Sequence, residues 1–273
     1  MKEIVYFKKT EHRKEFVLWC FKKLFTAPEG AKILVKPNVV SAETYPSTTH
    51  PKVLETILEF LTRKKYNLKV GDGPAFEAGN ANDIIQNHPL NQVCQNYGLK
   101  LINFLGDKFE KINTGQGLEL IISSFALQSD YLISLPVLKP HTWTDLTGAL
   151  KNQFGLFPSQ ERIAMHRKKR DIHKSIAACN VVIKPDLFIV DAIQTYRYAN
   201  EKRHGSGEPV YLGYMYAGKD PVALDCFGLE LLKSVAPRLQ NKEVVDIAHL
   251  AYAVQFGAGT KNYRAVEVEK VEV

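Results

Sequence analysis

The chain has 273 residues, of which 45% are hydrophobic and 24% are charged, a composition typical of an ordinary globular protein. This length suffices for one large α/β domain, or for two closely joined lobes, with a core that needs no disulfides. The net charge of +7 at pH 7, with histidine neutral, favours acidic ligands such as phosphates, carboxylates or nucleic acid.

The four cysteines, Cys20, Cys94, Cys179 and Cys226, are far apart and form no CxxC pair. The sequence therefore has no local motif for a zinc site or an iron–sulfur cluster. Scattered cysteines fit a reducing compartment and are usually buried, although Cys226 is the best placed for a reactive thiol. No apolar leader begins the chain and no run is long enough to span a membrane, so we expect a cytoplasmic protein.

Strand and helix patterns alternate along the first half of the chain. They predict, in order, a strand at 4–7, a helix at 11–25, a strand at 31–35, a helix at 51–65, a strand at 67–70 and helical pieces between 80 and 97 that break near Pro89. Pro51 at the first helical position, with Thr49 or His50 as the cap, marks the start of the second helix. This order is the signature of βαβ units and a parallel sheet.

The second half continues the alternation. It predicts strands at 99–104, 118–122, 130–135, 186–193 and 211–217, helices at 162–179, 220–233 and 241–255, and an exposed edge strand at 265–273. We expect a single α/β domain over residues 1–273 with a mainly parallel sheet flanked by helices. Two sub-lobes with a boundary near residue 130 are the alternative.

Four loops follow predicted strands. They are Lys36-Pro37-Asn38, Gly71-Asp72-Gly73-Pro74, Lys139-Pro140-His141 and Asp191-Ala192. In an open α/β sheet, ligands bind beyond the carboxyl ends of the strands. If the strands are parallel, all four loops gather at one edge, and the sequence then predicts a single site there.

The stretch 135–166, LPVLKPHTWTDLTGALKNQFGLFPSQERIAMH, carries the most polar groups beside an apolar strand. We expect Thr142 or Thr144 to cap a helix that carries Lys151 and Asn152. The N–H groups at its start, flanked by Lys139 and His141, would form an anion cradle. On that helix Asp145, Gly148 and Asn152 would share a face, with Gly148 allowing either a ligand or a neighbouring element to approach.

Other ligand motifs are weak. The sequence contains neither GxxxxGK[ST] nor a full GxGxxG after a strand, so no nucleotide motif supports a cofactor. His166 and His173 would share one helical face about 10 Å apart, too far for one ion. A divalent metal held by His141 and His166 with Asp72 or Asp191 as an oxygen ligand is the remaining cofactor hypothesis.

Two alternatives to an enzyme are a nucleic-acid-binding protein and a non-catalytic assembly factor. The first is suggested by the basic run 166–170, HRKKR, and by the loop 197–204. Such positive segments bind nucleic acid through phosphates, with a steep dependence on salt. A solvated helix face is the favoured explanation of the run, and no aromatic residues interrupt it for base stacking. A non-catalytic assembly factor would leave the polar residues of 135–166 dispersed on the surface.

The sequence resembles the family of domain-of-unknown-function 362 proteins. The matching pieces are KPNVVS at 36–41, TTHP at 48–51, VGDGP at 70–74, LPVLKPHTWTDLTGALKNQFG at 135–155, His166, IVDAI at 189–193 and AGKDPVALD at 217–225. The resemblance implies a shared core in which Lys139, His141, Lys151, Asn152, His166 and Asp191 match the family's polar positions. Many members carry an appended ferredoxin-type segment with clustered cysteines, which suggests a redox role; this chain has no such segment.

We therefore expect an enzyme that acts on a small anionic metabolite. The expected substrate-binding residues are Lys36, Asn38, Lys139, Lys151 and Asn152. His141 or His166 would move protons, because imidazole titrates near neutrality. Asp72 or Asp191 would orient a histidine or bind a metal, and the reaction is either a redox step with an external electron donor or metal-assisted.

Overall fold

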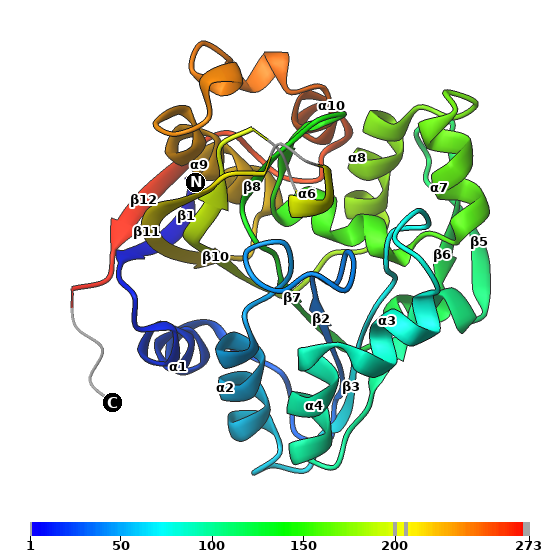
Figure 1. The fold of residues 1–273 in the computed structure, drawn as a ribbon, viewed down its shortest axis with the longest axis vertical. Helices are drawn as coiled ribbons and strands as arrows, with labels where there is room; N and C mark the ends of the chain where they lie inside the picture. The colour runs from blue at the N-terminus through cyan, green and yellow to red at the C-terminus, as the bar shows by residue number, and fades with distance from the viewer. Residues whose placement is uncertain (1, 199–200, 205–206, 270–273) are drawn as a thin grey trace.

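The computed structural model describes residues 2–198, 201–204 and 207–269, and its centre is an eight-stranded sheet (Figure 1). The strand order is β12-β1-β11-β10-β7-β2-β3-β4. The strands are β1 (Glu3–Lys9), β2 (Lys32–Pro37), β3 (Asn67–Asp72), β4 (Leu101–Asn103), β7 (Tyr131–Leu135), β10 (Leu187–Tyr196), β11 (Pro209–Gly218) and β12 (Tyr263–Glu267). The run from β10 to β4 is parallel, and only β11 is antiparallel to its neighbours β10 and β1. The predicted α/β fold with a mainly parallel sheet is confirmed.

The sheet is buried on both faces because alternate strand residues point to opposite sides and both sets are apolar. In β2, Ile33 and Val35 join the cluster under one helical layer, while Leu34 joins a cluster on the other face. The first layer contains α1 (Arg13–Leu24), α2 (Pro51–Leu61), α3 (Ala81–Asn87) and α4 (Pro89–Asn96). The second contains α6 (Ala149–Asn152), α8 (Ile172–Val182), α9 (Pro221–Lys233) and α10 (Ala248–Phe256), as Figure 1 shows.

Helix starts follow the predicted capping signals. His50 caps α2 by accepting from the Lys52 N–H, and Pro51 is the first helical residue. The helical region 80–97 breaks at His88, whose ring caps α4 ahead of Pro89. These predictions are confirmed for a simple reason. The start of a helix leaves N–H groups unpaired; a side-chain acceptor satisfies one of them, and a proline at the first position has no N–H to pair.

The stretch after β7 departs from its prediction. Instead of a loop and a long helix, it forms a small hairpin of β8 (Lys139–His141) and β9 (Asp145–Thr147), followed by the short helix α6. The residue at the N-cap position of α6 is Gly148, which has no side chain to cap the helix. The expected cap at Thr142 or Thr144 is therefore wrong. The 3-10 turn η2 (Gln153–Leu156) then continues the chain towards α7.

The helix expected at 162–179 is two helices, α7 (Ser159–His166) and α8. The break contains Lys168 at a φ of 58°, a left-handed conformation that ends a helix, and Asp171 caps the start of α8. His166 and His173 consequently lie on different helices. The expectation that they share one helical face is therefore wrong.

Other differences concern the edges of elements. The strand β10 extends beyond Asp191 to Tyr196, and β5 (Phe109–Asn113) pairs with β6 (Glu119–Ser123) in a hairpin that was half predicted. The edge strand β12 begins at Tyr263, and residues 270–273 of its predicted range lie outside the described residues. The remaining elements are the helix α5 (Ser124–Leu127) and the 3-10 turns η1 (Phe104–Gly106), η3 (Lys202–His204), η4 (Pro237–Leu239) and η5 (Val244–Asp246).

Strands from both sides of residue 130 belong to the same sheet, since β2 pairs with β7 over five residue pairs. No helix of the described residues combines the length and the apolar character that crossing a lipid bilayer requires. All four cysteines are buried. Burial raises the pKa of the Cys226 thiol to about 12, so the expectation that this thiol is reactive is not supported.

Candidate functional site

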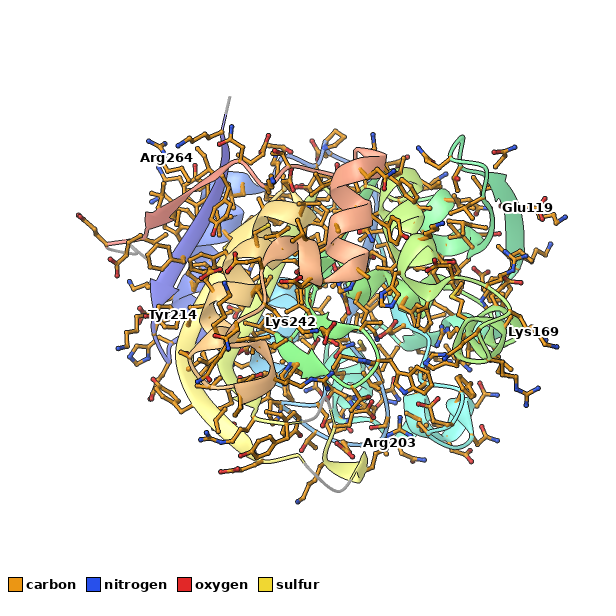
Figure 2. All side chains as sticks on the ribbon, turned by 90° about the horizontal axis from the view of Figure 1, so that it is seen from above. Glu119, Lys169, Arg203, Tyr214, Lys242 and Arg264 are labelled. Carbon is orange, nitrogen blue, oxygen red and sulfur yellow. The ribbon has the colours of Figure 1, made fainter. Side chains whose placement is uncertain are left out.

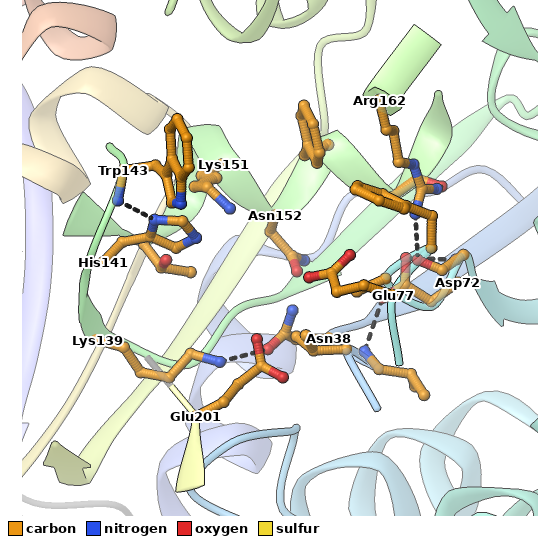
Figure 3. A pocket seen from close by; sticks show the side chains of 18 of the residues that line it. Asn38, Asp72, Glu77, Lys139, His141, Trp143, Lys151, Asn152, Arg162 and Glu201 are labelled. Carbon is orange, nitrogen blue, oxygen red and sulfur yellow. Dashed lines mark hydrogen bonds between the residues drawn. The ribbon is translucent and has the colours of Figure 1, made fainter. Parts of the chain in front are cut away.

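The strand order reverses between β2 and β7. From β2 the chain continues outward to β3 and β4, whereas from β7 it continues in the other direction to β10. Such a reversal separates the loops at the carboxyl ends of the two strands and is where open α/β sheets bind ligands. A cavity of about 400 Å³ lies at this point, lined by the segments that follow β2, β3 and β7 and by α6 and α7. Figure 3 shows the side chains that surround it.

Lys139 enters the cavity from β8 and is 1% exposed. Its ammonium donates to the amide oxygen of Asn38, at 3.1 Å, and to the backbone carbonyl of Ser47. Burial lowers the pKa of Lys139 to about 8, against the nearby charges of Glu201 and Glu43, which act to raise it. The ammonium is thus fixed in position by two neutral acceptors, and one of its three protons remains for a ligand.

Lys151 reaches the same cavity from α6. Its amine lies 5.2 Å from the centre of the Phe154 ring and makes no hydrogen bond or ion pair with the described part of the chain. Burial, followed by the nearby positive charge of Lys139, lowers the pKa of Lys151 to about 8. Two lysines inside one cavity add positive charge to it, which Glu77 and Glu201 in its lining offset in part.

His141 follows Lys139 on β8 and is 8% exposed. Its Nδ1 accepts hydrogen bonds from the backbone N–H groups of Trp143, at 3.1 Å, and Thr144, at 3.3 Å. Burial, and then the charges of Lys151 and Lys139, lower the pKa of His141 well below its ordinary value. The neutral ring therefore carries its proton on Nε2, and Figure 3 shows the ring beside the Lys151 amine.

His166 also lines the cavity, from the last turn of α7. Its Nδ1 lies 2.8 Å from the backbone carbonyl of Arg162, which can only accept. In the neutral ring the proton is accordingly on Nδ1, and Nε2 is a free base, the reverse of His141. Three aromatic rings surround the imidazole edge-on, with centroid distances between 5.3 and 5.9 Å, from Phe76, Trp143 and Phe154.

Asn152 lines the cavity from the end of α6 and is 3% exposed. Its amide nitrogen donates to Ser134, at 2.9 Å, and to the carbonyl of Lys36. Its amide oxygen is buried and has no hydrogen-bond partner within residues 2–198, 201–204 and 207–269. A buried acceptor without a partner is costly, so this oxygen suits a ligand that donates a hydrogen bond.

Asp72 lines the cavity and forms an ion pair at 2.6 Å with Lys36 beneath it, and the two side chains are 2% and 0% exposed. Asp72 also accepts from the N–H groups of Val39 and Gly73. A Cβ on Gly155 would lie 2.0 Å from the Asp72 carboxylate, so this glycine is required for the chain to pass over the ion pair. Lys36 is therefore part of the floor of the site, not a residue that reaches a ligand directly.

The guanidinium of Arg162 holds the turn after β3 in place. It is 2% exposed and donates to four backbone carbonyls, of Phe157, Gly73, Pro74 and Gly155. Burial lowers the pKa of Arg162 to about 10. The charge adds to the positive potential of the cavity, while its hydrogen bonds fix the loop that carries Asp72.

The expected anion cradle at the start of the helix is wrong. The N–H groups of Ala149 and Leu150 donate to the carboxylate of Asp225, on α9, at 2.6 and 3.0 Å. A Cβ on Gly148 would lie 2.1 Å from the same carboxylate, so this glycine admits the Asp225 side chain. Asp145 is on β9, bonded to Arg238 and Lys242, and does not share a helix face with Asn152.

Two acidic residues that the sequence analysis did not select also line the cavity. Glu77 follows the turn after β3, and Glu201 comes from the segment after β10, where it is 2% exposed. Arg203 bonds both, at 3.0 Å to Glu77, and so connects the two segments. No local pattern marks these residues, because their loops are far apart in sequence and meet only over the folded sheet.

Asp191 does not line the cavity. Its strand continues past it, and its carboxylate bonds Arg13 of α1, at 2.6 Å, and the hydroxyl of Tyr45, in the loop between β2 and α2, at 2.7 Å. Asp72 is occupied by Lys36 and two N–H groups. Within the described ranges no group of three or more histidine, cysteine, aspartate or glutamate residues is arranged to hold a metal. The expected metal set of His141 and His166 with Asp72 or Asp191 is therefore not assembled.

The basic run 166–170 lies away from the cavity except for His166. Lys169 is exposed at the periphery of the molecule, as Figure 2 shows. Arg170 bonds the carboxylate of Glu161, at 3.0 Å, and the carbonyl of Glu119. The run is therefore the turn that links α7 to α8, with Arg170 committed to contacts inside the chain.

The fold and the cavity define an α/β protein with a cationic, histidine-containing pocket at a sheet switch point. The model of the family described as "Domain of unknown function (DUF362)" matches residues 33–230. The chain belongs to this family, as its motifs suggested.

A curated relative gives a more distant comparison. The thylakoid-associated protein sll1697 of Synechocystis sp. is 26% identical over 210 residues, which cover 75% of this chain and 64% of the relative. This chain thus spans less than two thirds of the length of that protein.

One solved structure shares the fold at low identity, and a second gives a weaker superposition. The lactate racemase apoprotein from Thermoanaerobacterium thermosaccharolyticum superposes with a TM-score of 0.56 at 16% identity, over 86% of this chain and 58% of that one. A structural-genomics protein from Thermotoga maritima superposes with a TM-score of 0.46 at 12% identity, over 84% of this chain and 58% of that one.

Proposed function

We propose that the protein is an enzyme that binds a small anionic metabolite in this pocket and moves a proton on it with His141 and His166. One observation carries the proposal. Two lysines with lowered pKa values and two imidazoles with opposite proton positions face a single cavity of about 400 Å³. That volume is near the lower end of the range for small-molecule sites.

The lysines account for the preference for an anion. Lys139 is anchored by Asn38 and Ser47 and directs its remaining proton to the ligand, and Lys151 adds a second, unpaired positive charge. A carboxylate or phosphate group between them would be held in surroundings of low dielectric constant, where charge–charge attraction is stronger than in water. The unpartnered oxygen of Asn152 would accept a hydrogen bond from a hydroxyl or amine of the same ligand.

The imidazoles account for acid–base chemistry. His141 presents Nε2–H to an oxygen of the substrate, and His166 presents an unprotonated Nε2. A donor and a base in one cavity allow one proton to leave the substrate while its developing negative charge is stabilised. Groups positioned in this way typically contribute about 10²- to 10⁴-fold in rate. A redox step with an external electron donor would use the same anion site and the same imidazoles.

The comparisons are consistent with a substrate of this kind. The solved neighbour is named as a lactate racemase, and lactate is a small carboxylate with a hydroxyl group. We also propose a reducing, cytoplasmic location, which the four buried, unpaired cysteines support.

Titration calorimetry with a panel of small carboxylates and phosphates tests the binding step. The matched control is Lys64→Met, since the Lys64 amine also lies over a phenylalanine ring, 5.5 Å from the centre of Phe60. Lys64 is exposed, so we expect this variant and the wild type to bind at least one panel member with equal affinity. Lys151→Met should weaken binding about tenfold or more, because a hydrogen bond to a charged group contributes about 1.5–3 kcal/mol to the binding free energy. Equal affinity in all three proteins would refute the proposed anion site.

Proton transfer is measured on the panel member that binds most tightly. In deuterated water, the wild type should exchange a carbon-bound proton of that ligand, followed by nuclear magnetic resonance. His166→Gln should retain binding and lose about 10² or more in exchange rate. Exchange that is unchanged in both His141→Gln and His166→Gln would leave a binding site without the proposed chemistry.

A further inference from the structure

We propose that Lys151 is a nucleophile that forms an imine with the carbonyl group of its substrate, so that the metabolite is an aldehyde or ketone that also carries a carboxylate or phosphate. This inference rests on the proposed function, because it uses the same pocket and the same anionic ligand. It goes beyond that function by assigning a covalent step to one residue and a carbonyl group to the substrate.

The contacts of the three lysines at this site separate their roles. Lys36 is bonded to Asp72 at 2.6 Å under the floor of the cavity, and Lys139 donates to Asn38 and Ser47. Burial lowers the pKa of Lys36 and Lys139 as well, but these hydrogen bonds hold each of their ammonium groups in place and engage its protons. In the described part of the chain the Lys151 amine makes no hydrogen bond or ion pair; it lies over the ring of Phe154 with the His141 ring nearby, so its nitrogen can present a lone pair to the cavity.

Placement next to a second cation favours the neutral amine. A lysine that lies in an apolar pocket, or beside another cationic group, loses its proton more readily and becomes nucleophilic. Lys151 meets both conditions, with the ring of Phe154 against it and Lys139 across the cavity. The lowered pKa of about 8 agrees with this geometry, against about 10.4 for an ordinary lysine.

His141 and His166 line the same cavity as Lys151, and we assign the proton transfers of the reaction to them. The Lys151 ammonium gives one proton to Nε2 of His166, and the neutral amine then attacks the carbonyl carbon, whose oxygen accepts a hydrogen bond from Nε2–H of His141. A carbon–nitrogen bond forms, and a second proton passes from nitrogen to the oxygen. His166 returns its proton to the hydroxyl, which leaves as water, and the iminium keeps the last of the three original protons. Mass and charge balance, and no oxidant or reductant is consumed.

The anion requirement follows from Lys139. Its ammonium is fixed by two acceptors and cannot take part in the covalent step without losing both, so it holds the carboxylate or phosphate while Lys151 reacts. Figure 3 shows the two amines entering the pocket from separate segments, Lys139 from the hairpin and Lys151 from α6. A compact substrate with an anionic group at one end and a carbonyl near the other matches this arrangement.

Reductive trapping tests the inference directly. The full chain is incubated with glyoxylate or with glycolaldehyde phosphate and sodium cyanoborohydride, and the modified peptide is identified by mass spectrometry. We expect one main adduct, on Lys151, in the wild type and in Lys64→Met, and a trapping rate that rises as the pH increases through about 8. The probe that gives the faster reaction distinguishes a carboxylate site from a phosphate site.

Lys151→Arg is the decisive variant, because it keeps the positive charge and removes the nucleophilic amine. It should bind the probe within about tenfold of the wild type and give no adduct at position 151. An adduct spread over surface lysines, or no adduct with either probe, would overturn the inference. If calorimetry still shows binding in that case, the anion site of the proposed function survives without the imine.

Discussion

Three lysines, Lys36, Lys139 and Lys151, lie around one pocket, and their amines differ in what they contact. Lys36 faces a carboxylate, Lys139 two neutral oxygens and Lys151 an aromatic ring. Because a charge that leaves water must be compensated by its new surroundings, these contacts decide whether a lysine stabilises the fold or remains available to a ligand.

The Lys36–Asp72 pair provides a stability prediction. Lys36→Met should lower the free energy of unfolding by about 3–5 kcal/mol, because Asp72 would remain buried without its cation. Lys52→Met is the matched control, since Lys52 pairs with Glu55 on the surface and the loss should be under about 1 kcal/mol. Urea denaturation of both variants measures the difference, and equal midpoints would show that the buried pair contributes no more than the exposed one.

At the level of residues, one simple rule predicted where the candidate site would lie: loops that follow parallel strands meet at one edge of the sheet. Lys139 and His141 follow a parallel strand and Asn38 follows its neighbour, so all three were expected at the same edge of the sheet, where the cavity is found. The same rule placed Asp191 there, but β10 continues to Tyr196 and carries its carboxylate to Arg13 instead. Glu201 and Arg162 could not be found in this way, since they reach the pocket from segments whose position depends on the whole fold.

At the level of elements, α6 is a helix of four residues that depends on another helix. Asp225 of α9 accepts from its first two N–H groups, in place of the local cap that the sequence suggested. Short strands such as β8 and β9 were also missed, because three residues are too few for the alternating pattern that marks a strand. The long apolar strands and the capped helices were predicted, since their signals are local.

Gly148→Ala tests the contact between α6 and α9. The added methyl group would lie 2.1 Å from the Asp225 carboxylate, so we expect a loss of about 1–3 kcal/mol in stability and weaker ligand binding through a displaced Lys151. Gly106→Ala is the control, because nothing lies within 4 Å of its added carbon. Thermal unfolding distinguishes the two, and an unchanged melting temperature for Gly148→Ala would contradict the packing described here.

The contact between α8 and α10 predicts a response to acid. His249 is completely buried, its ring lies 6.3 Å from that of His173, and burial lowers its pKa to about 3. The unfolded chain takes up a proton at this residue below about pH 6.5, whereas the folded chain does not until about pH 3. Stability should therefore fall as the pH decreases through this window, by up to about 1.4 kcal/mol per pH unit from this residue.

His249→Leu removes this proton uptake. The variant should lose less stability than the wild type between about pH 6.5 and about pH 4, by up to about 3 kcal/mol, in urea titrations at each pH. Its stability above pH 7 serves as the reference. Parallel curves for the two proteins across the window would show that His249 does not contribute to the acid response.

At the level of the whole molecule, one sheet brings together segments from the entire chain. The parallel run from β10 to β4 was predictable because buried parallel strands read as continuous apolar runs joined by helices. The antiparallel insertion of β11 between β10 and β1 had no such signal, since strand order depends on which edges remain open after the helices pack. The switch between β2 and β7 then gathers the lysines and histidines at one point.

A crystal structure of the protein with the most tightly bound anion of the calorimetric panel tests the proposal most directly. We predict that its carboxylate or phosphate lies within hydrogen-bond distance of Lys139, with the rest of the ligand between Lys151, His141 and His166. An anion bound only at the protein surface, with the pocket between these four side chains unoccupied, would contradict the proposed function.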